Sequence, residues 1–168
     1  MTGIVEELRV CAAALGDPSG PAGLYRAVQT SLQRLIGHRL FTLLVTVSDG
    51  AEVERIWSSD ETAYPLTGRK RMGPTPWGDL VLKGRQPWLG NDAAAIRWAF
   101  PDHELIASLG LASCINIPVV AFGRTLGTMN ILDREGAYGP ARVETAALFA
   151  PALAAPFLDL SRNEGTSA

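Results

Sequence analysis

The stretch from residue 114 to residue 133, CINIPVVAFGRTLGTMNILD, constrains the fold most strongly. Two apolar runs flank a turn at Phe122 and Gly123, a pattern typical of a β-hairpin. Each run nevertheless carries an asparagine, Asn116 in the first and Asn130 in the second. A buried amide with unpaired hydrogen-bonding groups costs about 1–3 kcal/mol. We therefore expect at least one amide to line a cavity and bond ligand or water. The alternative is that each caps a nearby loop backbone.

The length of the turn decides whether the two amides share a face of the sheet. A two-residue turn places Asn116 opposite Met129. A three-residue loop over 121–123 places Asn116 opposite Thr128, with Asn130 on the same side. Both registers remain open at this point.

The order of the elements predicts an α+β fold with an antiparallel sheet. Apolar residues at helical spacing predict helices over 4–15 and from Pro21 to about 35. Residues 38–58 predict a hairpin with an Asp49-Gly50 turn. Prolines between 58 and 110 favour short elements only. These are a helix at 76–84, a strand at 86–90, and helical turns at 92–100 and 101–110. A last helix over 140–160 should kink near residue 150, because Pro151 and Pro156 interrupt it.

Composition narrows the class of protein. The chain has 168 residues, enough for one domain, which we place at 1–160 and follow with a frayed tail at 161–168. Its net charge of −2 gives no basic field for nucleic acid. Acidic residues near the start do not fit a signal peptide, and no apolar run approaches the length of a membrane span. Two distant cysteines indicate free thiols. We expect a cytoplasmic domain that binds neither nucleic acid nor membrane.

The run IPVVAFGRTLGTMNILD resembles the most recognisable segment of the GAF domain family. In that family an apolar strand, a turn glycine, an "LG" pair (here Leu126 and Gly127) and a second apolar strand follow one another. The resemblance covers about residues 21–160. It implies a central antiparallel sheet of five or six strands, with terminal helices on one face and an irregular helical middle covering a pocket on the other.

The resemblance also implies pairing through the terminal helices, so the protein is expected to be a homodimer. The N-terminal helix, within residues 1–16, then becomes a candidate dimer contact. Its apolar stripe contains Ile4, Leu8, Cys11 and Leu15. The alternative is that this stripe covers its own sheet, because the two uses look alike in sequence.

Aromatic residues gather where the resemblance places the pocket: all four tryptophans lie between residues 57 and 98. Stiff aromatic walls with a few polar groups are typical of small-ligand cavities. The alternative is a local core beneath a long loop.

The polar candidates also have alternatives. Asp92 could cap a helix instead of contacting a ligand, and His103 could form a surface ion pair. The basic segment 68–71 could hold an anionic group or remain a solvated loop. The expected ligand contacts are Trp57, Tyr64, Trp77, Asp92, Arg97, Trp98, Phe100, His103, Asn116 and Asn130.

An enzyme using the same pocket is the alternative function, with His103, Asp92 and Cys114 as candidate catalytic groups. The chain looks distantly similar to free-standing GAF domains that reduce free methionine sulfoxide. Asn91 stands where their cysteine is expected, so that resemblance fails at its central residue. Cys114 in an apolar strand should be inert. His38 and His103 lie in different predicted elements, so we expect no metal site.

We therefore expect a sensory or regulatory module that encloses a small molecule between the sheet and the aromatic middle region. Ligand-dependent ordering of that region would carry a signal to an effector protein or to a second copy. A dimerisation domain without ligand is the third hypothesis.

Overall fold

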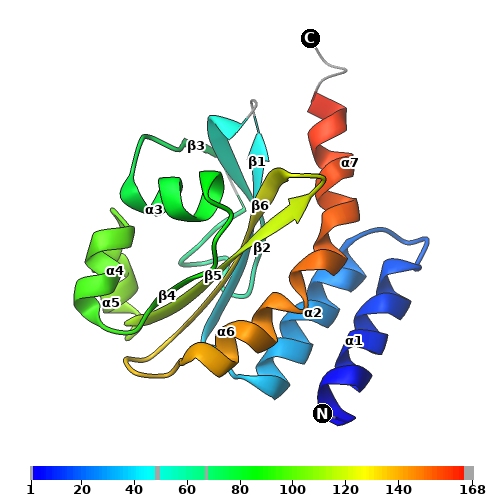
Figure 1. Ribbon diagram of the computed structural model, residues 1–168, viewed down its shortest axis with the longest axis horizontal. Coiled ribbons are helices and arrows are strands. Elements are labelled where there is room, and N and C mark those ends of the chain that lie inside the picture. The colour runs from blue at the N-terminus through cyan, green and yellow to red at the C-terminus, as the bar shows by residue number, and fades with distance from the viewer. Residues whose placement is uncertain (1, 48–49, 67, 165–168) are drawn as a thin grey trace.

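The computed structural model of the protein describes residues 2–47, 50–66 and 68–164. Its centre is an antiparallel sheet of six strands in the order β3-β2-β1-β6-β5-β4 (Figure 1). The α+β class and the expected sheet are confirmed. Asp49, in the expected Asp49-Gly50 turn, lies outside the described residues. The strands are β1 (Leu40–Val47), β2 (Glu52–Ser58), β3 (Arg69–Arg71), β4 (Trp88–Gly90), β5 (Ser113–Ala121) and β6 (Arg124–Asp133).

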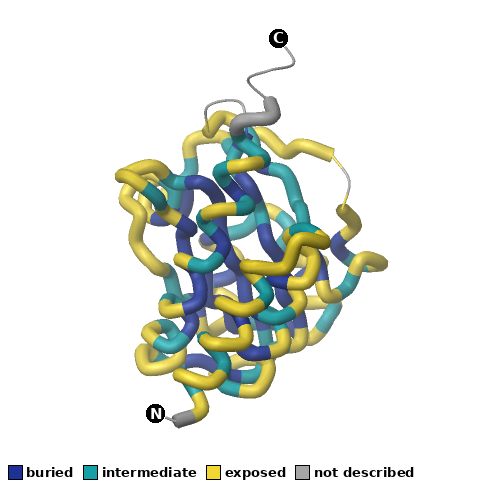
Figure 2. The backbone as a smooth tube through the Cα atoms, turned by 90° about the vertical axis from the view of Figure 1, so that its right-hand side faces the viewer, coloured by how far each residue is buried: buried dark blue, intermediate teal, exposed yellow. Residues whose placement is uncertain are grey.

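Helices from the two ends of the chain cover one face of the sheet, as Figure 1 shows. Strand residues such as Phe41 and Met129 meet Phe149, Leu153 and others from the helices in the main core. This packing explains the buried band through the middle of the molecule in Figure 2. The elements on this face are α1 (Thr2–Leu15), α2 (Ala22–Leu35), α6 (Pro140–Ala147), the 3₁₀ segment η3 (Ala150–Leu153) and α7 (Ala154–Glu164).

The prolines interrupt the C-terminal helix as expected, since η3 separates α6 from α7 at residue 150. Proline lacks the backbone N–H that a continuous helix needs. The expectation that no apolar run approaches the length of a membrane span is wrong, because by length and composition the stretch Pro140–Ser161 is apolar enough to cross a membrane. Here it buries Phe149, Leu153 and Phe157 completely against the sheet, as a core helix does. The expected tail at 161–168 begins inside α7; residues 165–168 lie outside the described part of the chain.

The apolar stripe of α1 packs mainly within the chain. Cys11 is 1% exposed in the main core and Leu8 packs against that core, whereas Leu15 is 46% exposed. Glu7 on the same helix accepts a hydrogen bond from Ser31 Oγ at 2.7 Å and pairs with Arg34 at 3.2 Å. The stripe thus covers α2 and the core, close to the alternative use considered above. A homodimer stays a prediction.

Short elements cover the opposite face of the sheet. They are α3 (Pro76–Gly78), the π-helical turn η2 (Asp79–Lys83), α4 (Ala93–Ala99) and α5 (His103–Ser108). Their buried side chains pack with strand residues in two small clusters, one around Ile106 of α5 and Leu132 of β6 and one around Trp77 and Val81. The space between these elements and the sheet is not filled completely, and the candidate site lies there.

Two β-bulges set which side chains face that space. Leu43 pairs with Trp57 but Leu44 pairs with Arg55, so Ile56 is an extra residue in β2. Side chains alternate along a regular strand, and an extra residue reverses the alternation. Arg55 therefore faces the cavity, whereas Trp57 joins the helical face.

The second bulge lies in the β5–β6 hairpin. Phe122 (φ 50°) and Gly123 (φ 74°) form a two-residue turn with both φ angles positive. Leu126 is then an extra residue in β6, and the register shifts by one. Asn116 consequently lies opposite Asn130. Neither expected register is correct, because a turn length alone does not reveal a bulge farther along the strand.

Candidate functional site

A cavity of about 420 Å³ lies between the sheet and the short elements. This volume is within the ordinary range for small-molecule sites. Its described lining consists of Leu40, Thr42, Leu44, Val53, Arg55, Tyr64, Gly68, Arg69, Lys70, Arg71, Met72, Gly73, Thr75, Trp77, Ala99, Phe100, Pro101, Asp102, Ile106, Asn116, Asn130 and Leu132.

A chain of side-chain hydrogen bonds crosses the floor of the cavity. Trp77 Nε1 donates to Asn116 Oδ1 at 2.9 Å. Asn116 Nδ2 donates to Asn130 Oδ1 at 2.7 Å, and Asn130 Nδ2 donates to Thr42 Oγ1 at 3.2 Å. Each amide nitrogen carries two hydrogens, and the chain uses one of them. The second hydrogen of Asn130 is therefore left for a guest, whereas the Asn116 side chain also interacts with the Cys114 thiol.

The wall beside β2 combines a cation, an aromatic ring and a carboxylate. The Arg55 guanidinium lies 4.8 Å from the centre of the Tyr64 ring, and Arg55 Nη1 donates to Pro65 O at 3.1 Å. Tyr64 donates its hydroxyl proton to Asp102 Oδ2 at 3.0 Å. Burial and the neighbouring Asp102 charge raise the pKa of Tyr64, so it stays a neutral donor. Burial lowers the pKa of Arg55, but a guanidinium keeps its charge at neutral pH.

Aromatic rings cover the cavity from the side of the short elements. Trp77 and Phe100 line it, with ring centres 5.8 Å apart. Trp77 is held by the start of α3, where Thr75 accepts a hydrogen bond from Gly78 N and Pro76 occupies the first turn. The two rings are tilted by 53° to one another and give the guest two apolar ring faces beside the amides.

Five of the ten expected ligand contacts line the cavity, and five do not. The contacts placed in the wall are Tyr64, Trp77, Phe100, Asn116 and Asn130. Trp57 lies on the other face of the sheet, where its ring meets Tyr25 at 5.8 Å and its Nε1 donates to Gln29 Oε1 at 2.8 Å. The bulge at Ile56 explains this placement.

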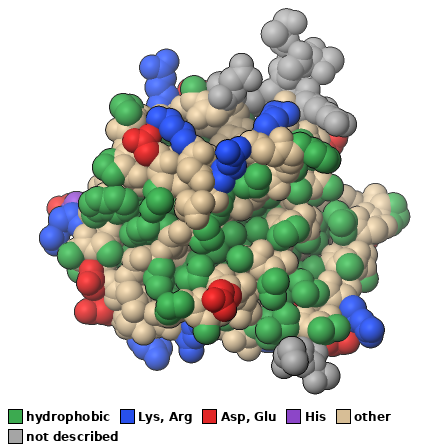
Figure 3. Space-filling model, viewed as in Figure 1, with side chains coloured by type: hydrophobic (Ala, Val, Ile, Leu, Met, Phe, Trp, Pro, Cys, Tyr) green, Lys and Arg blue, Asp and Glu red, His purple; other side chains and the backbone are tan. Residues whose placement is uncertain are grey.

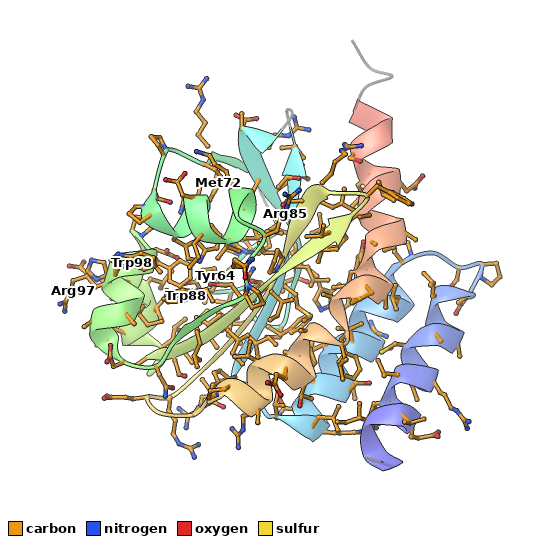
Figure 4. All side chains as sticks on the ribbon, viewed as in Figure 1. Tyr64, Met72, Arg85, Trp88, Arg97 and Trp98 are labelled. Atoms are coloured by element: carbon orange, nitrogen blue, oxygen red, sulfur yellow. The ribbon has the colours of Figure 1, made fainter. Side chains whose placement is uncertain are left out.

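The remaining four expected contacts belong to α4 and α5, outside the lining. Arg97 is exposed and points away from the molecule in Figure 4, and Trp98 is 49% exposed and stacks on Trp88 at 5.9 Å. These helices turn Ile96, Ala99 and Ile106 inward instead. Asp92 accepts a hydrogen bond from Ala95 N at 2.8 Å as a helix cap, the alternative considered for it. His103 begins α5 and is also absent from the described lining.

The three candidate catalytic groups do not come together in this cavity. Asp92 and His103 lie outside its described lining, and so does Cys114. Cys114 is completely buried, and burial raises the pKa of its thiol, which disfavours the reactive thiolate. Asn91 accepts hydrogen bonds from Ser113 Oγ at 2.7 Å and from Tyr138 N at 3.3 Å, so it anchors the chain between strands. Among the described residues, no three His, Cys, Asp or Glu side chains could hold a metal ion.

Sequence reasoning missed several lining residues. Thr42, Arg55 and Asp102 were not expected contacts, although each bonds or touches an expected one. The basic segment 68–71 was expected either to hold an anionic group or to remain a solvated loop; its last three residues form β3 and line the cavity. Two consecutive charged residues, Glu54 and Arg55, break the alternation of charged and apolar residues in β2, and this is the signal that could have identified the wall. Figure 3 shows several Lys and Arg side chains near the upper edge of the molecule.

A six-stranded antiparallel sheet with terminal helices on one face and a roofed cavity on the other is the architecture of a GAF-like domain. The sequence pattern described as "GAF domain" matches residues 19–155. The chain belongs to the GAF domain family. No significant match to the chain is found among curated protein sequences.

Solved structures share this fold at low sequence identity. The GAF domain of a phosphoenolpyruvate-protein phosphotransferase from Coxiella burnetii is 17% identical, with a TM-score of 0.73 over 98% of both chains. A free methionine-R-sulfoxide reductase from Neisseria meningitidis, solved with its substrate, is 18% identical, with a TM-score of 0.67 over 94% of this chain and 88% of that one. The chromophore-binding domain of a bacteriophytochrome from R. palustris is 13% identical, with a TM-score of 0.66 over 97% of this chain and 62% of that one.

Proposed function

We propose that this GAF domain is a sensory or regulatory module that binds a small molecule between its sheet and the short elements from β3 to α5. The observation that carries the proposal is the hydrogen-bonded chain from Trp77 through Asn116 and Asn130 to Thr42 on the cavity floor. A core needs no such row of amides, because apolar side chains of similar shape would fill the space without a desolvation cost.

The shape and chemistry of the cavity support the same proposal. Apolar side chains such as Leu40, Phe100 and Leu132 surround a small number of fixed polar groups. Small-ligand sites commonly have this composition, in which burial gives affinity and the polar groups give orientation. The neighbours described as bound to a substrate or as chromophore-binding support a small-molecule role for the fold.

Mass spectrometry of the small molecules released from the purified, denatured protein tests this proposal. We expect one compound in a ratio near one per chain, which rebinds unchanged to fresh protein and raises its melting temperature. A Thr42→Phe variant should lose the compound because the larger side chain enters the cavity. Absence of any released compound, together with no stabilisation by a metabolite library, would contradict the proposal and favour a dimerisation domain without ligand.

Binding rather than turnover is the activity that we propose. Asp92 is engaged as a helix cap, the Cys114 thiol is buried, and His103 is outside the described lining. Incubation of the recovered compound with fresh protein distinguishes the two activities. Turnover that disappears in His103→Ala or Asp92→Asn would support an enzyme.

Transmission of the signal is proposed to use a second copy or an effector protein. Val5 and Leu15 are exposed apolar side chains on α1, so a homodimer through this helix would bury them. Light scattering of the wild type and of a double variant, Val5→Glu with Leu15→Glu, tests that contact. We expect the wild type to be a dimer and the double variant to be a monomer. The cytoplasmic location is part of the same proposal and is compatible with the fold.

A further inference from the structure

The charge of the cavity wall is strongly asymmetric. Its described lining contains four cationic side chains and one carboxylate, that of Asp102. Three of the cations belong to β3, where Arg69 pairs with Glu54 at 3.4 Å. The fourth, Arg55, lies on the neighbouring strand β2, which pairs with β3. A guest at this wall therefore meets a positive field at one side of the cavity.

Arg55 has unused hydrogen-bonding capacity in this position. Among the described residues its Nε is buried without an acceptor, whereas Nη1 donates to Pro65 O at 3.1 Å. A buried donor without a partner is costly, and burial disfavours the charged guanidinium. A small rotation of the planar guanidinium toward the cavity would present two parallel N–H groups to a carboxylate.

The single carboxylate of the wall does not fill this role. Asp102 already accepts the Tyr64 hydroxyl proton at 3.0 Å, and no ion pair between Asp102 and Arg55 is found among the described residues. The Tyr64 ring lies 4.8 Å from the guanidinium carbon of Arg55, a cation–π contact that keeps Arg55 beside Tyr64. Tyr64 thus binds Asp102 through its hydroxyl and Arg55 through its ring, so Asp102 is engaged while Arg55 keeps N–H groups for a ligand.

The rest of the cavity selects a flat apolar body. Trp77 and Phe100 provide aromatic surfaces, and the Asn116–Asn130 pair provides amide N–H groups on the floor. Within about 420 Å³ a guest has room for one planar ring system and a short acidic substituent.

We infer that the ligand of this site is a small carboxylate with a flat apolar body, whose carboxylate is bound by Arg55 and whose body lies against Trp77 and Phe100. This inference rests on the proposed function and names the chemical class of its ligand. The β3 cations attract the acid toward the opening, and Arg55 makes the direct contact.

Matched acid and amide probes test the inference. The pairs are indole-3-acetate with indole-3-acetamide and 4-phenylbutyrate with 4-phenylbutyramide, measured by calorimetry on the full chain. We expect at least one acid to bind about tenfold or more tightly than its amide, because only the acid forms charge-assisted bonds with Arg55. Added salt should weaken binding of the acid and leave binding of the amide unchanged.

Single-residue variants test whether Arg55 causes the preference for the acid over the amide. Arg55→Met should remove the preference for the acid, and Arg55→Lys should keep only part of it. Asp102→Asn should strengthen acid binding, since it removes the carboxylate of the described cavity lining. Arg97→Met, outside the cavity, removes the same formal charge as Arg55→Met and should bind the acid like the wild type. Circular dichroism of each variant checks its fold.

The outcomes separate this inference from the proposed function. Equal binding of acid and amide, or an acid preference that survives Arg55→Met in a folded protein, would overturn the carboxylate while leaving a small-molecule site. Failure of every acid to bind in the millimolar range would also overturn it. Failure of all probes, together with no compound released from the purified protein, would overturn both.

Discussion

Asn116 Nδ2 donates a hydrogen bond to Asn130 Oδ1 at 2.7 Å, joining the amides of two directly opposed residues on β5 and β6. Both side chains are almost completely buried, at 1% and 5% exposure. The pair also connects Trp77 on one side with Thr42 on the other. Removing one amide therefore leaves partners on both sides without a bond.

The first prediction concerns the coupling of this pair. Asn116→Leu should lower the free energy of unfolding by about 1–3 kcal/mol, because Trp77 Nε1 and Asn130 Oδ1 lose their partner. The double variant with Asn130→Leu should cost less than the two single variants together, by about 1 kcal/mol. Urea unfolding of the wild type, the two single variants and the double variant measures this double-mutant cycle. Strict additivity would mean that the two amides act independently.

Trp77 should report on occupation of the cavity. It is the tryptophan in the described lining, whereas Trp98 is half exposed on α4. A bound compound should change the tryptophan emission of the wild type and of Trp98→Phe. The change should be lost in Trp77→Phe, which also leaves Asn116 Oδ1 without its donor. A response retained in Trp77→Phe and absent in Trp98→Phe would place the ligand near α4 instead.

Gly127 is required by close packing. A Cβ atom there would lie 2.0 Å from Leu44 O and 2.7 Å from the Phe157 ring. Gly127→Ala should therefore lower the free energy of unfolding by about 3 kcal/mol or prevent folding. Gly3→Ala, on α1, is the matched control. A Cβ atom at Gly3 would lie 3.9 Å from its nearest neighbour, Leu35 Cδ2, which is an ordinary contact. Thermal unfolding should show this control unchanged or up to about 1 kcal/mol more stable. Equal stability of the two variants would refute the packing argument.

Tyr25 should make the protein sensitive to alkali. Its hydroxyl is buried without a partner among the described residues, and burial first, then Asp159, raises its pKa to about 12. Because the unfolded tyrosine ionises near pH 10, the wild type should lose stability as pH rises from there toward 12.

Tyr25→Phe separates this effect from general alkaline unfolding. At pH 7 the variant should be as stable as the wild type or slightly more stable, because it removes an unpaired buried hydroxyl. At pH 11 it should lose about 1 kcal/mol less than the wild type. Urea midpoints at the two pH values measure the difference. Parallel pH profiles for the two proteins would show that Tyr25 does not ionise differently on unfolding.

The sequence predicted the fold well because the fold depends on periodic patterns. The helices of both ends, the β5–β6 hairpin with its turn at Phe122 and Gly123, and the interruption at residue 150 all follow from spacing, glycine and proline. These signals are local, so neighbouring residues are enough to identify them.

The site was predicted less completely, because it depends on two bulges and on the rotation of short helices. The extra residue at Ile56 moved Trp57 to the helical face and left Arg55 at the cavity. The extra residue at Leu126 brought Asn116 opposite Asn130. On α4, Arg97 and Trp98 lie on the outer side. Neither feature has a clear local pattern, since tertiary packing decides them.

The most direct measurement of the central claim is a nitrogen–proton NMR titration of the side-chain amides and indoles. A compound recovered from the protein, or an acid from the matched pairs, is added to the labelled chain. We predict that the Asn116 and Asn130 amide signals and the Trp77 indole signal shift together and saturate at one ligand per chain, while the Trp98 indole stays in place. Binding that leaves the Asn116, Asn130 and Trp77 signals unmoved would contradict a ligand site on this cavity floor.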